Sequence, residues 1–147
     1  MVEVIDELNI IPLWQQLWPG RQIPFMSSML FPKGYDISIY KKYKPTYFGY
    51  SIDGNIIGVN SGHKTSDTDY RSRGLFVLPE FRNKGIALKL LQATINQAKE
   101  EGCTVVWTIP RDTSLYAYYR AGFDRASDFF ETETSAKNCY AIYKIDG

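Results

Sequence analysis

Residues 74–87 carry the side chains and backbone best suited to hold a phosphate-rich ligand. An apolar run ends there, and a short loop with Arg82 and Lys84 beside Gly85 leads into an apolar helical stripe. The N–H groups of a helix's first turn have no partner within the helix, and they carry the positive end of its dipole. Glycine lets an anion approach this backbone closely. The loop therefore predicts a pyrophosphate site, although the same residues also fit a solvated turn before a helix.

Three residues of this loop form the pattern Arg82-x-x-Gly85-x-Ala87. Together with the strand-like residues 75–81 before it, the pattern resembles the coenzyme A motif of the GNAT superfamily of N-acetyltransferases. A long amphipathic stretch, residues 83–101, follows the motif, as in that family. Its position between a strand and a helix makes the resemblance specific.

A second segment resembles the later signature of the same family, in which a tyrosine lies four residues before a Gly-Phe pair. Tyr118 and Gly122 have this spacing, and Phe123 completes the pair. One predicted helix and one predicted strand separate the two motifs, as they do in the family. The resemblance extends over about residues 46–123.

The resemblance implies a GNAT-like acyl-CoA N-acyltransferase fold whose sheet is splayed at the cofactor site, where two strands part around the pantetheine arm of acetyl-CoA. Main-chain groups of the first of these strands would bind the pantetheine amides and the thioester oxygen. Main-chain N–H groups of the loop would bind the pyrophosphate. One arginine stands where many relatives have Asn, and it would reach a phosphate. The implied cofactor-binding residues are Leu75, Phe76, Val77, Arg82, Asn83, Lys84, Gly85, Ile86, Ala87 and that arginine, Arg111.

Amide formation from a thioester needs a group that stabilises an oxyanion and a group that protonates the departing thiolate. A backbone N–H at a strand bulge suits the first task, and a phenol suits the second. The resemblance gives the general-acid role to Tyr118. Tyr116 and Tyr119 are its rivals in sequence, although helical spacing turns Tyr119 about 100° away from Tyr118. A tyrosine of the core or surface with no catalytic role also fits the position.

The general base is less well defined, because residues 70–74 lack the glutamate that some relatives use. His63 is the candidate base, since histidine alone has an ordinary pKa near neutrality, about 6.5. Asp67 and Asp69 are alternatives that would act through water. A structural role for His63 also fits its position near the end of a predicted hairpin strand.

The resemblance implies an acetyl-CoA-dependent N-acetyltransferase that transfers the acetyl group directly to a primary amine of a small molecule or peptide. The alternative is a non-catalytic coenzyme A binding or sensing domain of the same fold, since the glutamate is missing and Arg111 departs from the pattern. Nucleic-acid binding by the Lys- and Tyr-rich residues 40–48 is disfavoured because Pro45 interrupts them. Cys103 and Cys139 have no metal-ligand spacing, so we expect buried free thiols, no metal and no acyl-cysteine route.

The elements that must position these residues follow from hydrophobic periodicity and from helix and strand breakers. Asp53-Gly54 separates two β-rich runs and is typical of a two-residue hairpin turn. Two strands on either side of a long helix predict a parallel pair across the cofactor motif. The expected strands are residues 2–5, 46–52, 55–60, 70–78, 103–109, 123–133 and 138–145, and the expected helices are residues 8–18, 25–30, 83–101 and 113–121. This order predicts an α/β (α+β) fold with a mixed sheet of about six or seven strands and helices on both faces.

Size and charge limit the function further. The 147 residues fit one domain, residues 1–147, and 17 basic against 16 acidic residues argue against a general polyanion binder. No apolar run approaches the roughly 20 residues of a membrane span, and no signal-peptide pattern begins the chain, so we expect a cytoplasmic protein without membrane or nucleic-acid partners.

A homodimer is compatible with the resemblance, although no segment requires one. Residues 70–85 hold four basic residues and one acidic residue, which suits a phosphate-rich cofactor, whereas residues 124–133 hold four acidic residues and one basic residue, which suits a cationic amine.

Overall fold

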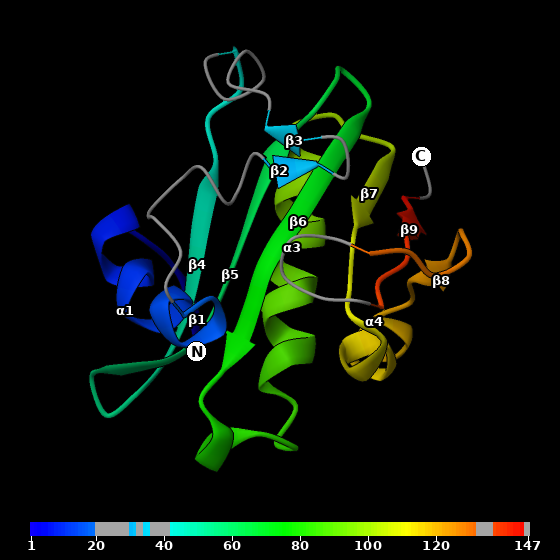
Figure 1. Ribbon diagram of the computed structural model, residues 1–147. Helices are drawn as coiled ribbons and strands as arrows, with labels where there is room; N and C mark the ends of the chain where they lie inside the picture. The colour runs from blue at the N-terminus through cyan, green and yellow to red at the C-terminus, as the bar shows by residue number, and fades with distance from the viewer. Residues whose placement is uncertain (20–29, 32–33, 36–41, 132–136, 146–147) are drawn as a thin grey trace.

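The computed structural model describes residues 1–19, 30–31, 34–35, 42–131 and 137–145 (Figure 1). In this part of the chain seven strands form one mixed sheet in the order β1-β4-β5-β6-β7-β9-β8, and two short strands form a separate antiparallel pair. The predicted sheet of six or seven strands is confirmed. The strands of the sheet are β1 (Val2–Ile5), β4 (Thr46–Ile52), β5 (Asn55–Lys64), β6 (Asp69–Val77), β7 (Val105–Thr108), β8 (Asp124–Arg125) and β9 (Ala141–Lys144), and the separate pair is β2 (Leu30–Phe31) and β3 (Gly34–Tyr35).

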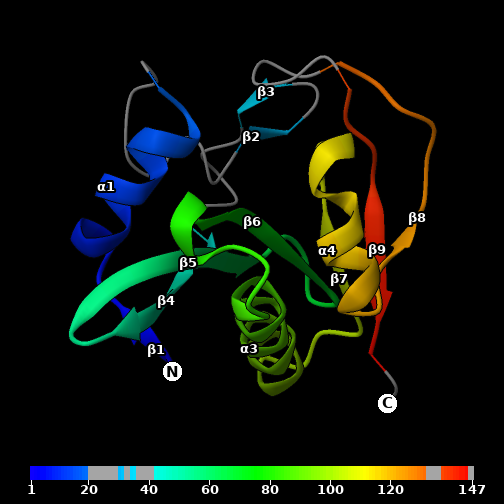
Figure 2. The same cartoon turned by 90° about the horizontal axis from the view of Figure 1, so that it is seen from below.

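Helices cover both faces of the sheet, as predicted (Figure 2). The first, α1 (Glu7–Leu17), packs on one face, where Trp14 joins Val59 of β5 in a buried cluster. Two others, α3 (Ile86–Glu100) and α4 (Leu115–Arg120), pack on the opposite face. There Leu91 of α3 and Tyr118 of α4 share a buried cluster with Tyr70 of β6. Successive residues of a strand point to opposite faces, so each strand supplies side chains to both clusters. Within the described ranges no helix combines the length and the apolar character that crossing a membrane requires.

The turn between β4 and β5 has the backbone that its sequence predicts. Asp53 and Gly54 have φ values of 51° and 80°, and a two-residue turn of this kind requires a positive φ at both positions. β4 spans the predicted residues, whereas β5 continues past Asn60 to Lys64. The longer strand carries His63 into the sheet beside β6.

β6 contains a bulge. Between Arg73 and Phe76, β6 has one residue more than the facing stretch of β5. Gly74 lies within this bulge with a φ of 84°, a conformation that favours glycine. The extra residue reverses the alternation of side chains, so that Arg73 and Phe76 both contact the α1 side of the sheet.

β6 and β7 pair in parallel over only three described residue pairs, which begin at Asp69 and end at Arg71 of β6. β7 ends at Thr108, whereas β6 continues to Val77, and the two strands diverge (Figure 1). In the described part of the chain, residues 75–77 therefore have no β7 partner along that edge. The predicted splaying of the sheet is confirmed.

α3 begins later than the sequence predicts. Its first residue is Ile86 rather than Asn83, because Asn83 and Gly85 have φ values of 63° and 79° and a right-handed helix excludes this backbone. A 3-10 turn, Pro79–Phe81, precedes this loop. The cofactor motif thus begins in a turn that ends at the helix N-cap, Gly85, and only its last two residues, Ile86 and Ala87, lie in the first turn of the helix.

The predicted strand over residues 123–133 is wrong for most of its length. β8 covers only Asp124–Arg125. The Tyr140 N–H then donates a hydrogen bond of 2.8 Å to the Ser127 hydroxyl, and a backbone donor used by a side chain in this way is lost to strand pairing. Beyond that point the described chain shows only isolated bridges, and residues 132–133 lie outside the described part.

Two further expectations differ from the structure or fall beyond it. The predicted helix over residues 25–30 lies outside the described residues except for Leu30, which begins β2. The last strand begins at Ala141 rather than at residue 138.

Candidate functional site

A cavity of about 590 Å³ lies between two parts of the chain that flank the split in the sheet. The end of β6 and the start of α3 form one wall, and residues 111–120 form the other. The C-terminal end of α1 contributes Gln16 and Leu17. The cavity thus occupies the region where β6 continues beyond its pairing with β7.

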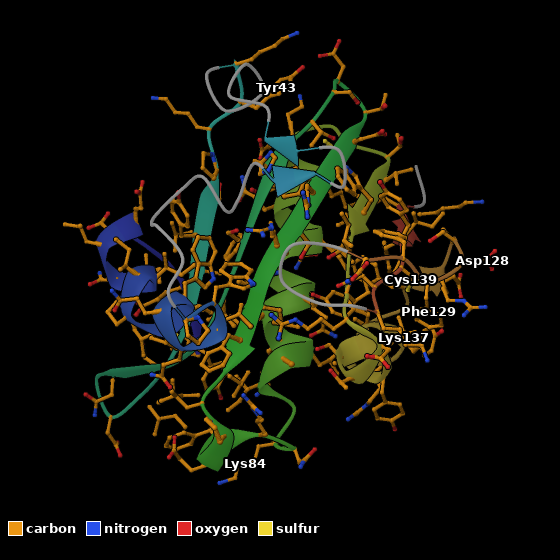
Figure 3. The ribbon with its side chains drawn as sticks, in the orientation of Figure 1. Tyr43, Lys84, Asp128, Phe129, Lys137 and Cys139 are labelled. Atoms are coloured by element: carbon orange, nitrogen blue, oxygen red, sulfur yellow. The ribbon has the colours of Figure 1, made fainter. Side chains whose placement is uncertain are left out.

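This cavity brings together nine of the ten predicted cofactor-binding residues. Lys84 is the exception, because its side chain is exposed and its Nζ lies 5.6 Å from the centroid of the Phe81 ring. Figure 3 shows Lys84 at the outer end of the loop. The nine that line the cavity are Leu75, Phe76, Val77, Arg82, Asn83, Gly85, Ile86, Ala87 and Arg111.

The loop before α3 presents backbone to the cavity. Asn83 and Gly85 both have positive φ, and Gly85 is the N-cap of α3 without a side-chain capping bond. The first N–H groups of α3, from Ile86 onward, have no partner within the helix. Arg82 Nε donates a hydrogen bond of 2.8 Å to the Val77 carbonyl, which ties the loop to the end of β6. These donors suit an anion held at the helix N-terminus.

Two residues of this wall were not among the predicted cofactor-binding residues, although Tyr116 was a candidate general acid. Tyr116 and Arg120 of α4 line the cavity beside Ala117. Their spacing of four residues puts them on one helix face, and that spacing was the available signal. With Arg82 and Arg111, Arg120 makes a third guanidinium around the cavity, as a ligand with several phosphate charges requires.

Tyr118 does not line this cavity, because its side chain points into the core. It is 4% exposed, and its ring meets the Phe123 ring edge-on at a centroid distance of 5.4 Å. Thr108, the last residue of β7, lies near enough to its hydroxyl to lower the pKa of the phenol. Burial raises the pKa of Tyr118 above its ordinary value of 10.0, against the opposing effects of Thr108 and the nearby arginines. The phenol therefore stays protonated at the inner end of the split.

Tyr116 and Tyr119, the other two candidate general acids, lie in more exposed environments than Tyr118. Tyr119 is 46% exposed and Tyr116 is 74% exposed, although Tyr116 reaches the cavity. The predicted difference in direction between Tyr118 and Tyr119 thus appears as a difference in burial.

His63 is fully buried on β5, opposite Arg71 of β6. Its Nδ1 lies 2.9 Å from the Lys64 carbonyl oxygen. A carbonyl only accepts, so Nδ1 carries the proton and Nε2 is the acceptor of the neutral ring. His63 does not line the cavity, and the structure brings it to the same face of the sheet as Arg71.

The alternative bases lie at the far end of the β5–β6 hairpin. The Tyr43 hydroxyl donates to Asp67 over 3.1 Å, and the Thr68 hydroxyl donates to Asp69 over 3.0 Å. Neither aspartate lines the cavity. Their hydrogen bonds to neighbouring loop residues account for them without a catalytic role.

Arg71 and Arg73 were assigned at the sequence level to the positive segment that suits the cofactor. Neither lines the cavity. Both are buried on the face of the sheet that α1 covers, with Arg73 over the Trp18 ring and Arg71 over the Trp107 ring. Of the basic side chains in residues 70–85, only Arg82 therefore faces the predicted phosphate site.

The acidic segment lies on the outside of the molecule. Asp124, Asp128 and Glu131 are exposed, and Glu133 lies outside the described residues. Figure 3 shows Asp128 beside Phe129 and Lys137, on the side of the molecule where β8 lies. These charges face solvent.

Cys103 and Cys139 are buried free thiols, as predicted. Burial raises the pKa of both, which keeps each thiol protonated and poorly nucleophilic. Among the described residues, no three His, Cys, Asp or Glu side chains gather closely enough to hold a metal ion. In the Lys- and Tyr-rich segment, residues 40–41 lie outside the described part, and Lys42 Nζ lies 5.2 Å from the centroid of the Tyr43 ring.

Comparison with solved structures shows the same fold along almost the whole chain. Ard1 from Thermoplasma volcanium has a TM-score of 0.75 and 16% identity, over 100% of this chain and 98% of that one. A GNAT family acetyltransferase from Elizabethkingia anophelis with acetyl-CoA bound has a TM-score of 0.64 and 14% identity, over 99% and 97%. An aminoglycoside 6'-N-acetyltransferase complexed with coenzyme A has a TM-score of 0.72 and 12% identity, over 100% and 98%. No protein with a curated description matches the chain.

The sequence itself matches one family model, described as the acetyltransferase (GNAT) family, over residues 10–123. The match includes the loop before α3 and the Tyr118 signature, which are the two motifs that carried the resemblance. It covers more than half of the chain, and the chain belongs to the GNAT acetyltransferase family.

Proposed function

We propose that the protein, a single domain over residues 1–147, transfers the acetyl group of acetyl-CoA directly to a primary amine of a small molecule or peptide. The observation that carries this proposal is the cavity at the split of β6 from β7, which combines an open strand edge with an anion-binding loop. Family membership supports acetyl-CoA as the donor, as does the presence of acetyl-CoA and coenzyme A in two of the similar structures.

The residues around the cavity fit this donor. Residues 75–77 would hydrogen-bond the pantetheine amides through their backbone, because β7 does not use that edge. The N–H groups of residues 82–87 would bind the pyrophosphate, and Arg82, Arg111 and Arg120 would neutralise phosphate charge. When bound, acetyl-CoA supplies an acetyl group activated as a thioester.

Two groups of this chain would then promote transfer. A backbone N–H at the bulge that contains Gly74 would stabilise negative charge on the acetyl carbonyl oxygen. The Tyr118 phenol would donate its proton to the departing sulfur. Its raised pKa supports this role, because the proton is present at neutral pH.

His63 is the proposed general base. With Nδ1 donating to the Lys64 carbonyl, Nε2 of the neutral ring would accept the amine proton through water. On β5 it pairs with Arg71, the last residue of β6 that pairs with β7, which supports a position near the start of the split.

Two measurements test the proposal. The first is thermal stabilisation by acetyl-CoA, and the second is release of free thiol from acetyl-CoA with a panel of primary amines. We expect stabilisation together with thiol release that depends on at least one amine. Stabilisation without thiol release would favour the non-catalytic coenzyme A binding domain. No response to acetyl-CoA in either assay would contradict both acetyl transfer and coenzyme A binding. Stabilisation by a single-stranded oligonucleotide instead would favour nucleic-acid binding.

A further inference from the structure

Arg71 and Arg73 lie at the inner end of the split, and the proposed acetyl transfer assigns them no task. They stand two residues apart on β6, so their side chains share one face and begin about 7 Å apart. Arg71 is 3% exposed and Arg73 is 7% exposed. Burial removes both guanidinium groups from bulk water, which strengthens their interaction with any charge beside them.

Aromatic rings hold each arginine from a different side. Arg71 Cζ lies 4.7 Å from the centroid of the Trp107 ring on β7, and Arg73 Cζ lies 4.3 Å from that of the Trp18 ring at the end of α1. A ring beneath a guanidinium restrains it and still allows its N–H groups to bind an anion in the guanidinium plane. The pair therefore spans the space between β7 and α1.

The pair lies near several groups of the proposed reaction, although neither arginine lines the cofactor cavity. Both arginines act to lower the pKa of the Tyr118 phenol, against the larger effect of burial, which raises it. His63 faces Arg71 across β5 and β6. Leu17, the neighbour of Trp18, lines the cofactor cavity. The two guanidinium groups and His63 thus share one face of the sheet where β6 and β7 begin to part, and Tyr118 lies close to them on the other face.

We propose that Arg71 and Arg73 bind an anionic group, a carboxylate or a phosphate, on the acceptor amine. This inference rests on the proposed acetyl transfer. Guanidinium groups pair with such anions through two parallel hydrogen bonds, whereas they repel an acceptor whose charges are all positive. The substrate class is therefore a small primary amine that also carries an oxyanion, as an amino acid or an amino phosphate ester does, and not a polyamine.

Burial lowers the pKa of Arg71 to about 9, which leaves it charged at neutral pH. By contrast, Asp124, Asp128 and Glu131 are exposed, and charges in water interact weakly with a ligand beyond about 10 Å. The buried positive pair therefore outweighs the acidic surface in selecting the acceptor. This reverses the attraction of a cationic amine that the charge of residues 124–133 suggests.

The experiment compares acceptors that differ only in the anion. Amino acids are paired with their C-terminal amides, and phosphoethanolamine is paired with ethanolamine. We expect kcat/KM to favour the anionic member of at least one pair by roughly 30-fold or more, since removing one partner of a buried charge pair costs at least that much. Arg73→Gln should bring the ratio close to 1, and Arg73→Lys, which keeps the charge, should give an intermediate ratio.

The matched control is Arg125→Gln, because Arg125 also lies over an aromatic ring, Phe129, but is exposed on β8. In Arg125→Gln the ratio of kcat/KM for the anionic acceptor to kcat/KM for its uncharged partner should equal that of the wild type. Thermal stabilisation by acetyl-CoA checks that the Arg73 variants remain folded. Equal kcat/KM for both members of every pair would overturn the inference and leave acetyl transfer intact.

A binding measurement separates this inference from the proposed function. With coenzyme A present, N-acetyl amino acids should stabilise the wild type, whereas N-acetyl amino acid amides should stabilise it less, and Arg73→Gln should lose the difference. That result without any thiol release would retain the anion site and refute acetyl transfer. No preference for the carboxylate in either binding or turnover would refute the anion site.

Discussion

The Trp14 indole Nε1 donates a hydrogen bond of 2.8 Å to the carbonyl oxygen of Gly74. Both groups are buried, and the bond joins residues 60 positions apart in sequence. It fixes α1 to the bulge of β6, immediately before the strand residues that line the cofactor cavity. The position of α1, and with it one wall of the cavity, therefore depends on a bulge one residue long.

Replacement of Gly74 by alanine tests this dependence. The φ of 84° strains any other residue, and a Cβ at this position would overlap the Trp14 indole. Gly54→Ala is the matched control, because Gly54 has a φ of 80° but no atom within 4 Å of the added Cβ. In urea denaturation, Gly54→Ala should lower the free energy of unfolding by about 1 kcal/mol, and Gly74→Ala should lower it by about 1–3 kcal/mol more. Equal losses would mean that the bulge tolerates a side chain against Trp14.

Removal of positive charge from the cavity wall should weaken acetyl-CoA binding. Arg120→Ala removes a guanidinium that lines the cavity, so the KM for acetyl-CoA should rise by roughly 10-fold, as expected for a lost charged hydrogen bond of about 1.5 kcal/mol. Lys84→Ala is the control, because Lys84 does not line the cavity and should change this KM by less than about 2-fold. If the two variants behave alike, the ligand does not lie where the cavity indicates.

The pH dependence of turnover follows from the environment of Tyr118. A general acid works in its protonated form, which is present below its pKa, and burial raises that pKa above 10.0. The kcat of the wild type should therefore show no fall with rising pH between about pH 7 and pH 10 that depends on this phenol. A falling limb in that range that disappears in Tyr118→Phe would show instead that the pKa is lowered.

Loss of the proposed base should matter most at low pH. An acceptor amine is largely protonated near neutral pH, and a base must then remove its proton, whereas at pH 9 to 10 much of it is already neutral. His63→Gln should therefore lower kcat/KM for the amine by roughly 10²-fold at pH 7 and by much less at pH 9.5. Asp67→Asn, at an exposed carboxylate, should leave both values unchanged. An equal loss at both pH values would assign His63 a structural role.

Local signals explain why much of the fold was predictable from the sequence. Asp53-Gly54 specifies its own turn, and the apolar stripe of α3 specifies its buried face without any distant contact. The start of that helix was misjudged because a positive φ at Asn83, a residue other than glycine, leaves no clear trace in sequence. The strand predicted over residues 123–133 failed for a similar reason, since the Ser127 side chain takes the Tyr140 N–H from 13 residues away.

In the candidate site, too, residues that are close in sequence were predictable, whereas contacts between distant residues were not. The loop residues that line the cavity are adjacent in sequence, so a short motif finds most of them. Arg71 and Arg73 were read as cofactor charges because their distance from the loop is small in sequence. The bulge at Gly74 turns Arg73 toward Trp18 instead, and only the paired register of β5 and β6 reveals it.

The most direct test of the proposed mechanism is the kcat of Tyr118→Phe measured beside that of Tyr119→Phe, with acetyl-CoA and an accepted amine. Both changes remove one hydroxyl from α4, but only the Tyr118 side chain lies in the core, near Thr108 at the end of β7. Tyr118→Phe should lower kcat by roughly 10²-fold or more while the KM for acetyl-CoA stays within about 3-fold, as expected for a general acid. Tyr119→Phe should behave as the wild type. A Tyr118→Phe enzyme with unchanged kcat would contradict acetyl transfer assisted by a proton from this phenol.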